Sequence, residues 1–439
     1  MNITVSNFIS NLIKKGSHLF HLSFWGFVEA FAGPITTIIL MPLLIKNIGY
    51  EDFGLWSLTI GFTAFGSLVS FGMSSSLTFE ASKNNLLKDR DVLVNSFRTC
   101  FTITSISCLF FSLIVIVFSK WISEAFFYDN SNVKSIRIGI IYAALLIFSQ
   151  ELDILISGFF KGLLLYKKNS VIEVFFRILI LVVLGLLALN GFGVLMMLKF
   201  MLLMYCMKLF VKMILTRNIL GDKCFIPLFD RGHIKKVFNF GFWIWIQVIG
   251  AILLSFFDRS IVASNFGLKQ VAIFSVALSL AQFLHTLTAT SLQFIFPKIS
   301  SWSQDDITKN KDKLIAITFF GFLLISLVFI FVLLICPIIF NLWLGKTFNS
   351  EDIYLSRALI FSYGLIAVSV PAHYVLMGLR KTRYIAFSNI IAGGITLLFS
   401  FYFASRGLIY FGFSKSVYGF ILFSHFIAVL YYVNKKEVF

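Results

Sequence analysis

The sequence predicts an all-α integral membrane protein with twelve transmembrane helices in two halves of six. Three observations predict this class. The 439-residue chain is 59% hydrophobic and 13% charged, with a mean hydropathy of +0.92, and a soluble domain of this size could not bury so much apolar surface. Twelve apolar stretches are long enough to cross a bilayer, and basic residues concentrate in alternate connections.

The twelve spans follow from length, because crossing the hydrocarbon core takes about 20 apolar residues. The first six predicted helices lie near 20–46, 54–79, 97–119, 134–160, 170–190 and 192–215. The second six lie near 237–264, 268–296, 314–341, 353–377, 384–404 and 408–433. We therefore expect an N-terminal lobe over 1–215, a cytoplasmic linker over 216–236 and a C-terminal lobe over 237–439.

An internal repeat supports the division into halves. A shift of 218 positions places the stretch 49–82 on 267–300, so that Gly49 falls on Gly267 and Ser57 on Ser275. Apolar positions between them also correspond. The shift is almost half of the chain length, which is the pattern of a transporter built from two similar units.

The distribution of Lys and Arg predicts the orientation. With a cytoplasmic N-terminus, 25 of the 37 basic residues fall on the inner side and 10 on the outer side, and every inner connection is basic. The inner set includes Lys208 and Lys212, and the outer set includes Lys415. Both termini are therefore expected in the cytoplasm. The first span resembles a signal peptide, but Glu29 interrupts its apolar run, so we expect it to remain uncleaved.

Several classes of function are excluded by the composition and the motifs. The formal charge of +17 is spread over short loops between apolar spans, which indicates membrane topology and not a nucleic-acid partner. Five scattered Cys and six dispersed His give no metal-ligand spacing, and no catalytic or nucleotide-binding motif occurs. We expect no metal, no cofactor and no catalytic residues.

Acidic residues inside the predicted helices are the first candidate functional residues, because a charged group at the centre of a membrane helix costs about 2.5–3.5 kcal/mol to insert. They are Glu29 in the first helix, Glu151 and Asp153 in the fourth, and Asp258 in the seventh. Each has two interpretations. It either lines a wetted cavity or neutralises a neighbouring cation. For Asp258 the spacing from Gln247, Ala251 and Ser255 predicts one polar face over three turns.

The basic candidates are Lys161, Arg177, Lys199 and Arg259. Lys161 continues the polar face that Asp153 begins. Arg177 is four residues after Glu173 and near the inner surface, where its alternative role is an interfacial anchor. Lys199 lies about two turns into the sixth helix, with the same alternative. Arg259 adjoins Asp258, and the two could instead neutralise each other at the helix end.

Four stretches resemble one transporter family. They are MPLLIKNIGYEDFGLWSL with the following FGMSSSLTFEAS, then SGFFKGLLLYKKNS, then FDRSIVASNFGLKQVAIFSVALSL, and finally FPKIS followed by LWLGKTF. They cover nearly the whole chain in order. The sequence is similar to Wzx-type O-antigen or capsule polysaccharide flippases of the multidrug/oligosaccharidyl-lipid/polysaccharide exporter superfamily.

The resemblance implies two six-helix lobes around a central cavity, in the inner membrane of a bacterium. Such relatives pass an undecaprenyl-pyrophosphate-linked oligosaccharide from the cytoplasmic to the periplasmic leaflet by alternating access. It implies that Arg177, Arg259, Lys161 and Lys199 bind the substrate, and that acids such as Glu29 bind protons or Na⁺ for coupling. Glu151, Asp153 and Asp258 would share that role. Membrane lipids, the lipopolysaccharide or capsule polymerase and the chain-length regulator are the expected partners.

Two alternatives remain open. A drug/cation antiporter of the same superfamily would prefer an acidic, aromatic cavity without fixed cations. A membrane-embedded glycan polymerase would carry a long outer loop with Arg or His, whereas the longest outer connection here is near 120–134 and has no such cluster.

Overall fold

The computed structural model describes residues 2–83, 90–127, 133–228, 257–292, 304–344, 349–379 and 381–434. It also describes Gly232, Phe242, 245–246, 248–250, Ile252, Ile295 and Ile299. Gln247, Ala251 and Ser255, which were expected to continue the polar face of Asp258, lie outside these residues. Within the described residues the chain is helical and contains no strand, as the composition predicts.

The N-terminal lobe consists of long helices with short connections. Its elements are α1 (Asn2–Phe62), the 3₁₀ turn Thr63–Phe65, α2 (Gly66–Val69), α3 (Met73–Lys83), α4 (Arg90–Phe127), α5 (Val133–Gly162), α6 (Tyr166–Leu189) and α7 (Val194–Leu220). A 3₁₀ turn, Asp222–Phe225, follows α7. The last helix therefore continues five residues into the segment expected to be the linker, and the chain leaves helical geometry at Gly221.

The C-terminal lobe contains more short helices. Its described elements are α9 (Phe257–Phe266), α10 (Leu268–Leu292), α12 (Gln304–Lys309), α13 (Lys311–Leu344), α14 (Ser350–Val368), α15 (Val370–Gly378), α16 (Thr382–Ala404), α17 (Leu408–Ser414), α18 (Ser416–Leu422) and α19 (Ser424–Asn434). A capping box starts α14: Asn349 accepts from the Asp352 amide at 2.9 Å, and the Asp352 carboxylate accepts from the Asn349 amide at 3.1 Å.

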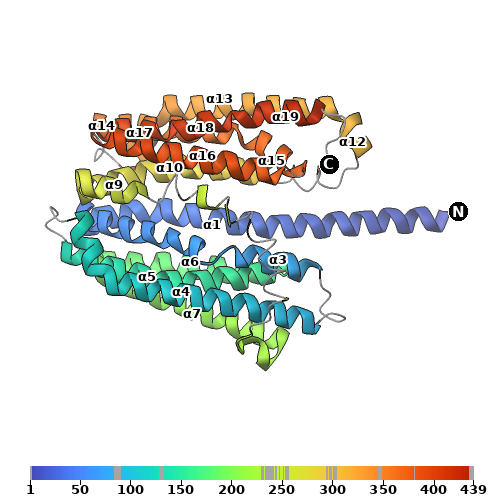
Figure 1. The fold of residues 1–439 in the computed structure, drawn as a ribbon, viewed down its shortest axis with the longest axis horizontal. Helices are drawn as coiled ribbons and strands as arrows, with labels where there is room; N and C mark the ends of the chain where they lie inside the picture. The colour runs from blue at the N-terminus through green and yellow to red at the C-terminus, as the bar shows by residue number, and fades with distance from the viewer. Residues whose placement is uncertain are drawn as a thin grey trace.

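Four glycines in left-handed geometry reverse the chain at one end of the molecule. Gly49 (φ 81°) divides α1 into two antiparallel arms, and Gly267 (φ 83°) separates α9 from α10. Gly191 (φ 73°) and Gly407 (φ 123°) make the corresponding turns before α7 and α17. Only glycine adopts such φ values without a steric penalty. We name this end the Gly49 end, and the opposite end, where the N-terminus lies in Figure 1, the terminal end.

Ten helices in the described residues are long and apolar enough to cross a membrane, against the twelve predicted. The difference has two sources. The first two predicted spans are the two arms of α1 with the elements that follow, and they appear as the single span Phe24–Val69. The seventh predicted span, 237–264, lies mostly outside the described residues.

Three predicted spans are broken helices. The second span bends at Phe71 and Gly72, both at positive φ, between α2 and α3. The tenth is α14 followed by α15, with Pro371 near the start of α15, where a missing amide proton costs no hydrogen bond. The twelfth is α17, α18 and α19 in succession. Broken helices at membrane depth expose backbone groups, so they occur where the protein interior or a cavity can satisfy them.

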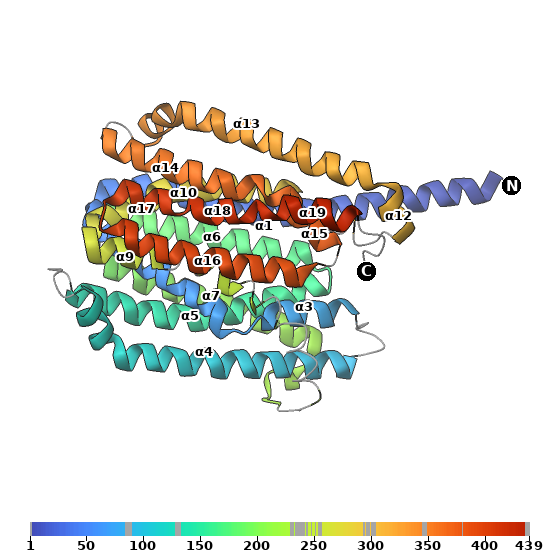
Figure 2. The same cartoon turned by 45° about the horizontal axis from the view of Figure 1, so that its top comes forward.

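The two lobes lie on either side of α1, with α3 to α7 on one side and α10 to α19 on the other (Figure 1). Figure 2 shows α4 and α13 as the outermost helices of their lobes. Both carry exposed apolar side chains such as Val117 and Leu342, which is the surface that a helix presents to lipid.

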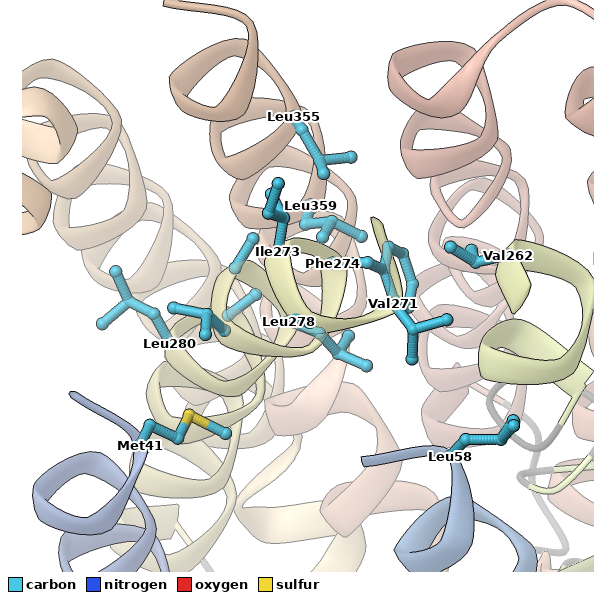
Figure 3. Close-up of a cluster of buried hydrophobic side chains, with 14 of the residues drawn as sticks. Met41, Leu58, Val262, Val271, Ile273, Phe274, Leu278, Leu280, Leu355 and Leu359 are labelled. Atoms are coloured by element: carbon cyan, nitrogen blue, oxygen red, sulfur yellow. The ribbon is translucent and has the colours of Figure 1, made fainter. Parts of the chain in front are cut away.

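The lobes meet in an apolar core at the Gly49 end. Figure 3 shows Met41 and Leu58 of α1 beside Val271, Phe274 and other buried side chains of α10. The contact reaches the backbone at Gly54, where a Cβ atom would lie 1.9 Å from the carbonyl oxygen of Leu268. The lobes are therefore closed against each other at this end.

Candidate functional site

A polar cavity of about 290 Å³ lies inside the N-terminal lobe, and we name it the N-lobe cavity. Helices α1, α3, α5, α6 and α7 line it. Its charged lining residues are Glu29, Asp153, Lys161, Glu173, Arg177 and Lys208. Four of the six N-lobe candidates named above therefore face one space, and they are Glu29, Asp153, Lys161 and Arg177.

Four charged side chains beside this cavity form a closed ion-paired cluster. Lys208 Nζ lies 2.6 Å from Asp153 Oδ2 and 3.1 Å from Glu173 Oε2. Lys212 Nζ lies 2.7 Å from Asp153 Oδ1 and 2.5 Å from Glu173 Oε1, and it also donates to Ser157 Oγ at 2.6 Å. All four charged side chains are buried. Each buried charge thus has two opposite charges as neighbours, which is the condition for tolerating it in a low-dielectric interior.

The sequence reasoning was wrong about Lys208 and Lys212, which were counted in an inner connection. Both lie on one face of α7, four residues apart, and point into the lobe. The acid Glu173 also pairs with these lysines, although the i,i+4 spacing had suggested Arg177 as its partner. One feature of the sequence could have indicated that these lysines are buried. They are four residues apart, on one helix face, at the end of an otherwise apolar span.

A second ion pair at the N-lobe cavity joins α5 to α1. Lys161 Nζ donates to Glu29 Oε1 at 2.6 Å. The other carboxylate oxygen of Glu29 accepts from Asn169 Nδ2 at 3.0 Å and from Ser170 Oγ at 3.2 Å. Lys161 and Glu29 come together from α5 and α1, so both candidates lie at the cavity, but Lys161 already has a carboxylate partner.

Arg177 has a different environment from the lysines. Within the described part of the chain its guanidinium forms no hydrogen bond or ion pair, and its Nε is buried. The side chain packs against Gly33 of α1, where a Cβ atom would come within 2.5 Å of Nη1. Gly33 therefore makes the space that the guanidinium occupies.

A second cavity, of about 240 Å³, is lined by α1, α6 and α7 and by Arg259 of the C-terminal lobe, and we name it the inter-lobe cavity. Arg177 and Tyr205 line both cavities, so the two adjoin at these residues. Arg259, from the C-terminal lobe, lines the inter-lobe cavity as well. Its Nε donates to Ser275 Oγ at 3.3 Å, and its side chain packs against Gly61. The structure thus places Arg177 and Arg259, one from each lobe, at a common cavity.

Asp258 does not face this cavity. It is buried and forms an ion pair with Lys415, whose Nζ also donates to Ser400 Oγ at 2.9 Å. Lys415 was counted in an outer connection, and this was wrong, because the residue is fully buried at the break between α17 and α18. Removing Lys208, Lys212 and Lys415 from the loop counts leaves 23 basic residues on the inner side and 9 on the outer.

The remaining two candidates do not line these two cavities. Glu151 is buried, with its carboxylate directed at Gly66, where a Cβ atom would lie 2.5 Å from Oε1. It is on α5 but points away from Asp153. Lys199 is exposed on the surface of α7.

The charged groups that line the two cavities, taken with the ion-paired groups beside them, leave one positive charge over on the side of each lobe. The N-lobe groups are four cations and three carboxylates, and the C-lobe groups are two cations and one carboxylate. Every lysine among them is ion-paired. The cations without an ion-paired carboxylate are therefore Arg177 and Arg259, and the shared cavity is suited to an anion with two charges.

Comparison with known proteins places the chain in a family. Residues 44–351, more than half of the chain, match the model of a family described as polysaccharide biosynthesis protein. A Shigella flexneri protein named as an O-antigen transporter is 23% identical over 153 residues, and this match spans 35% of the chain and 36% of that protein.

The fold is shared with solved transporters. The inward-facing conformation of a multidrug resistance MATE family transporter of the MOP superfamily matches with a TM-score of 0.69 and 13% identity, over 91% of this chain and 94% of that one. An outward-facing MATE structure matches with a TM-score of 0.61 and 14% identity, over 95% of both chains. The family match shows that the chain belongs to the polysaccharide biosynthesis protein family, and the structural matches show that it has the fold of MATE transporters, in agreement with the Wzx-type resemblance of its sequence.

Proposed function

We propose that this protein moves lipid-linked oligosaccharide repeat units, carried on undecaprenyl pyrophosphate, from the cytoplasmic to the periplasmic leaflet of a bacterial inner membrane for O-antigen or capsule assembly. The observation that carries the proposal is that Arg177 and Arg259, the two arginines without an ion-paired carboxylate, line one cavity. A pyrophosphate diester has two negative charges. Two fixed cations in the cavity would offset the desolvation of this group, and guanidinium groups match phosphate oxygens in geometry.

Alternating access is the proposed mechanism. The lobes are closed by apolar packing at the Gly49 end, which the basic-residue distribution predicts to be periplasmic. The pyrophosphate would enter from the cytoplasmic side and bind between Arg177 and Arg259, and the lobes would then reopen at the Gly49 end. The acyl chain would remain in the bilayer while the head group crosses.

Ion coupling is proposed at the carboxylates that line the N-lobe cavity, Glu29 and Asp153. Each is held by lysine, so binding of a proton or Na⁺ to either would compete with an ion pair and change the packing of α1, α5 and α7. Asp258 and Glu151, also expected to couple, are buried away from the two cavities, and they are proposed only as secondary sites. A polysaccharide polymerase and a chain-length regulator would use the translocated product.

A drug/cation antiporter is the weaker candidate, because a cationic drug would meet Arg177 and Arg259 at the cavity. A glycan polymerase would require groups that act on the sugar, and neither cavity has a histidine in its lining. Both alternatives predict a different product of gene deletion from the flippase.

Deletion of the gene tests the function. A flippase mutant should accumulate single undecaprenyl-linked repeat units on the cytoplasmic face of sealed inner-membrane vesicles, as read by periodate labelling of the sugars before and after permeabilisation. A polymerase mutant would accumulate them on the periplasmic face instead. Re-expression of Arg177→Ala or Arg259→Ala should restore transport at least tenfold less well than wild type, since a charge-assisted contact is worth about 1.5–3 kcal/mol. Arg137→Ala, at an exposed arginine of α5, is the matched control.

A further inference from the structure

Two tryptophans of the C-terminal lobe donate hydrogen bonds to main-chain oxygens of the N-terminal lobe. The indole Nε1 of Trp343, near the end of α13, lies 2.9 Å from the carbonyl oxygen of Ile38 on the first arm of α1. The indole Nε1 of Trp245, from the seventh predicted span, lies 2.7 Å from the carbonyl oxygen of Leu68 on α2. Each bond therefore joins helices of different lobes.

The carbonyl of Ile38 is available as an acceptor because of a proline. In a regular helix this oxygen would accept from the amide of the residue four positions later, which here is Pro42. Proline has no amide proton, so the helical hydrogen bond cannot form. Prolines are tolerated in membrane helices where a neighbouring helix satisfies the carbonyl that they leave free. The indole of Trp343 supplies that partner from the opposite lobe.

The carbonyl of Leu68 is available for a similar reason. Four positions later the chain reaches Gly72, where φ is 68° and the second predicted span is broken. The amide of Phe71 reaches this oxygen only at 3.4 Å. In both bonds between the lobes, an irregular helix thus offers an oxygen that a regular helix would have used itself.

Trp343 lies at the Gly49 end, where the lobes are closed. Helix α13 ends one residue after it, and Asn349, at the start of α14, lines a cavity of about 620 Å³ together with Tyr50 and Gly407. Tyr50 and Gly407 belong to two of the turns that define this end. The Trp343 ring packs on Phe340, which is buried in the apolar core between the lobes. The bond to Ile38 is therefore part of the closed contact.

We propose that the hydrogen bond from Trp343 to the Ile38 carbonyl is a latch that holds the Gly49 end closed. A movement that parts the lobes at this end carries the indole away from α1. The indole N–H then loses its acceptor, and the carbonyl has no helical donor to replace it. Pro42 makes this loss specific to the open conformation, because a residue with an amide proton would satisfy the carbonyl within α1 in both conformations. The bond therefore favours the closed conformation over the open one.

The latch rests on the alternating access proposed above, but its test requires no lipid-linked substrate. Val271, one turn after Leu268 on α10, is 0% exposed and belongs to the same apolar core as Leu58 of α1 (Figure 3). A cysteine at position 271 is therefore shielded until the lobes part. When reclosing is faster than the reaction, the rate at which such a cysteine reacts is proportional to the population of the open conformation, however small that population is.

The experiment introduces Val271→Cys into full-length protein whose exposed Cys206 is replaced by Ser. A membrane-impermeant maleimide is added from the periplasmic side of right-side-out membrane vesicles, and the rate of modification is measured. The same protein without Val271→Cys gives the background rate. Thermal unfolding of each variant is compared with that of its parent, so that a faster reaction is not mistaken for a lost fold.

Trp343→Phe keeps a large ring and removes the donor, so it should raise the rate about three- to tenfold, the effect of one net hydrogen bond. Trp121→Phe, at an indole of α4 that is 64% exposed, should leave the rate unchanged. Pro42→Ala gives the Ile38 carbonyl a helical donor, so Trp343→Phe should have little further effect in that background. Pro34→Ala removes the other proline of α1 and leaves the Ile38 carbonyl as it is, so Trp343→Phe should keep its full effect there.

An unchanged rate in Trp343→Phe, and in Trp343→Leu as a second variant without the donor, would overturn the latch. An equal effect of Trp343→Phe in the Pro42→Ala and Pro34→Ala backgrounds would also overturn it, because the indole would then act by packing alone. A cysteine at position 271 that reacts in none of the variants would refute opening at the Gly49 end, and with it both the latch and the proposed mechanism. The expected rates in a protein that moves no lipid-linked glycan would refute the transport function and leave the latch standing.

Discussion

The guanidinium of Arg177 occupies the space that the missing side chain of Gly33 leaves on α1, since a Cβ atom at Gly33 would approach Nη1 to 2.5 Å. Gly33→Ala should therefore move the guanidinium without disturbing either helix, because the atom that must shift is the far end of a flexible side chain. We expect roughly tenfold slower glycan export at unchanged membrane levels, as a displaced charged contact loses about 1.5 kcal/mol.

Gly26→Ala is the control for this variant. Gly26 lies two turns earlier on the same helix, and a Cβ atom there meets nothing within 4 Å. The Gly26→Ala protein should export glycan at the wild-type rate. The measurement is the rate at which lipid-linked sugars become accessible on the periplasmic side. Equal rates for both variants would show that the position of Arg177 is unimportant.

The buried ion-paired cluster should be sensitive to the loss of a single charge. Lys212→Met leaves two buried carboxylates with one cation, which costs about 3–5 kcal/mol of folding free energy. The combination with Glu173→Gln restores the balance of charge and should recover much of the loss. Lys120→Met, at a pair 4.0 Å apart whose side chains are 66% and 52% exposed, should change stability by at most ~1 kcal/mol. Thermal unfolding in detergent measures all three, and a Lys212→Met protein as stable as wild type would refute the pairing.

The two glycine turns should respond alike to substitution. Gly49 and Gly267 have φ values of 81° and 83°, and a Cβ atom at either meets nothing within 4 Å. An alanine there is strained by its backbone alone, so each variant should lose about 1–2 kcal/mol of stability in the same unfolding measurement. A large difference between Gly49→Ala and Gly267→Ala would contradict the equivalence of the two turns.

Access of water to the cavities can be mapped with cysteines introduced one at a time into a Cys206→Ser protein, whose four other cysteines are buried. Cysteines at positions 177 and 259 line the inter-lobe cavity and should react with a charged, membrane-impermeant thiol reagent. A cysteine at Asp258, which is 1% exposed, should react at least tenfold more slowly, because burial restricts reagent access. Protection of all three positions from both sides of the membrane would leave no aqueous path for a charged head group.

Hydropathy and the spacing of the turns predicted most of the architecture, because each lipid-facing helix has to be apolar over its full length. The shift of 218 positions also aligned two glycines that share one backbone conformation. The sequence could not show which lysines are buried. Lys208, Lys212 and Lys415 lie near the ends of apolar runs, where a lysine that faces water and one that pairs across helices look alike. Only the positions of Asp153, Glu173 and Asp258 in space distinguish them.

The sequence predicted two of the cations of the candidate site correctly, but it did not show which charged residues pair with one another. Arg177 and Arg259 stood out as charges inside spans, and both line one cavity. Lys199 stood out for the same reason but lies on the surface of α7, because the period of a helix does not reveal which face its neighbours cover.

At Gly54 the main chain of one lobe touches the carbonyl of Leu268 in the other, with no side chain between them. Such a contact has no rotamers with which to adjust to small displacements. The lobes can pivot about this contact or separate at it, but the two backbones cannot slide past each other. A movement that uncovers the Gly49 end must therefore either pivot at this contact or separate the helix backbones at Gly54 and Leu268.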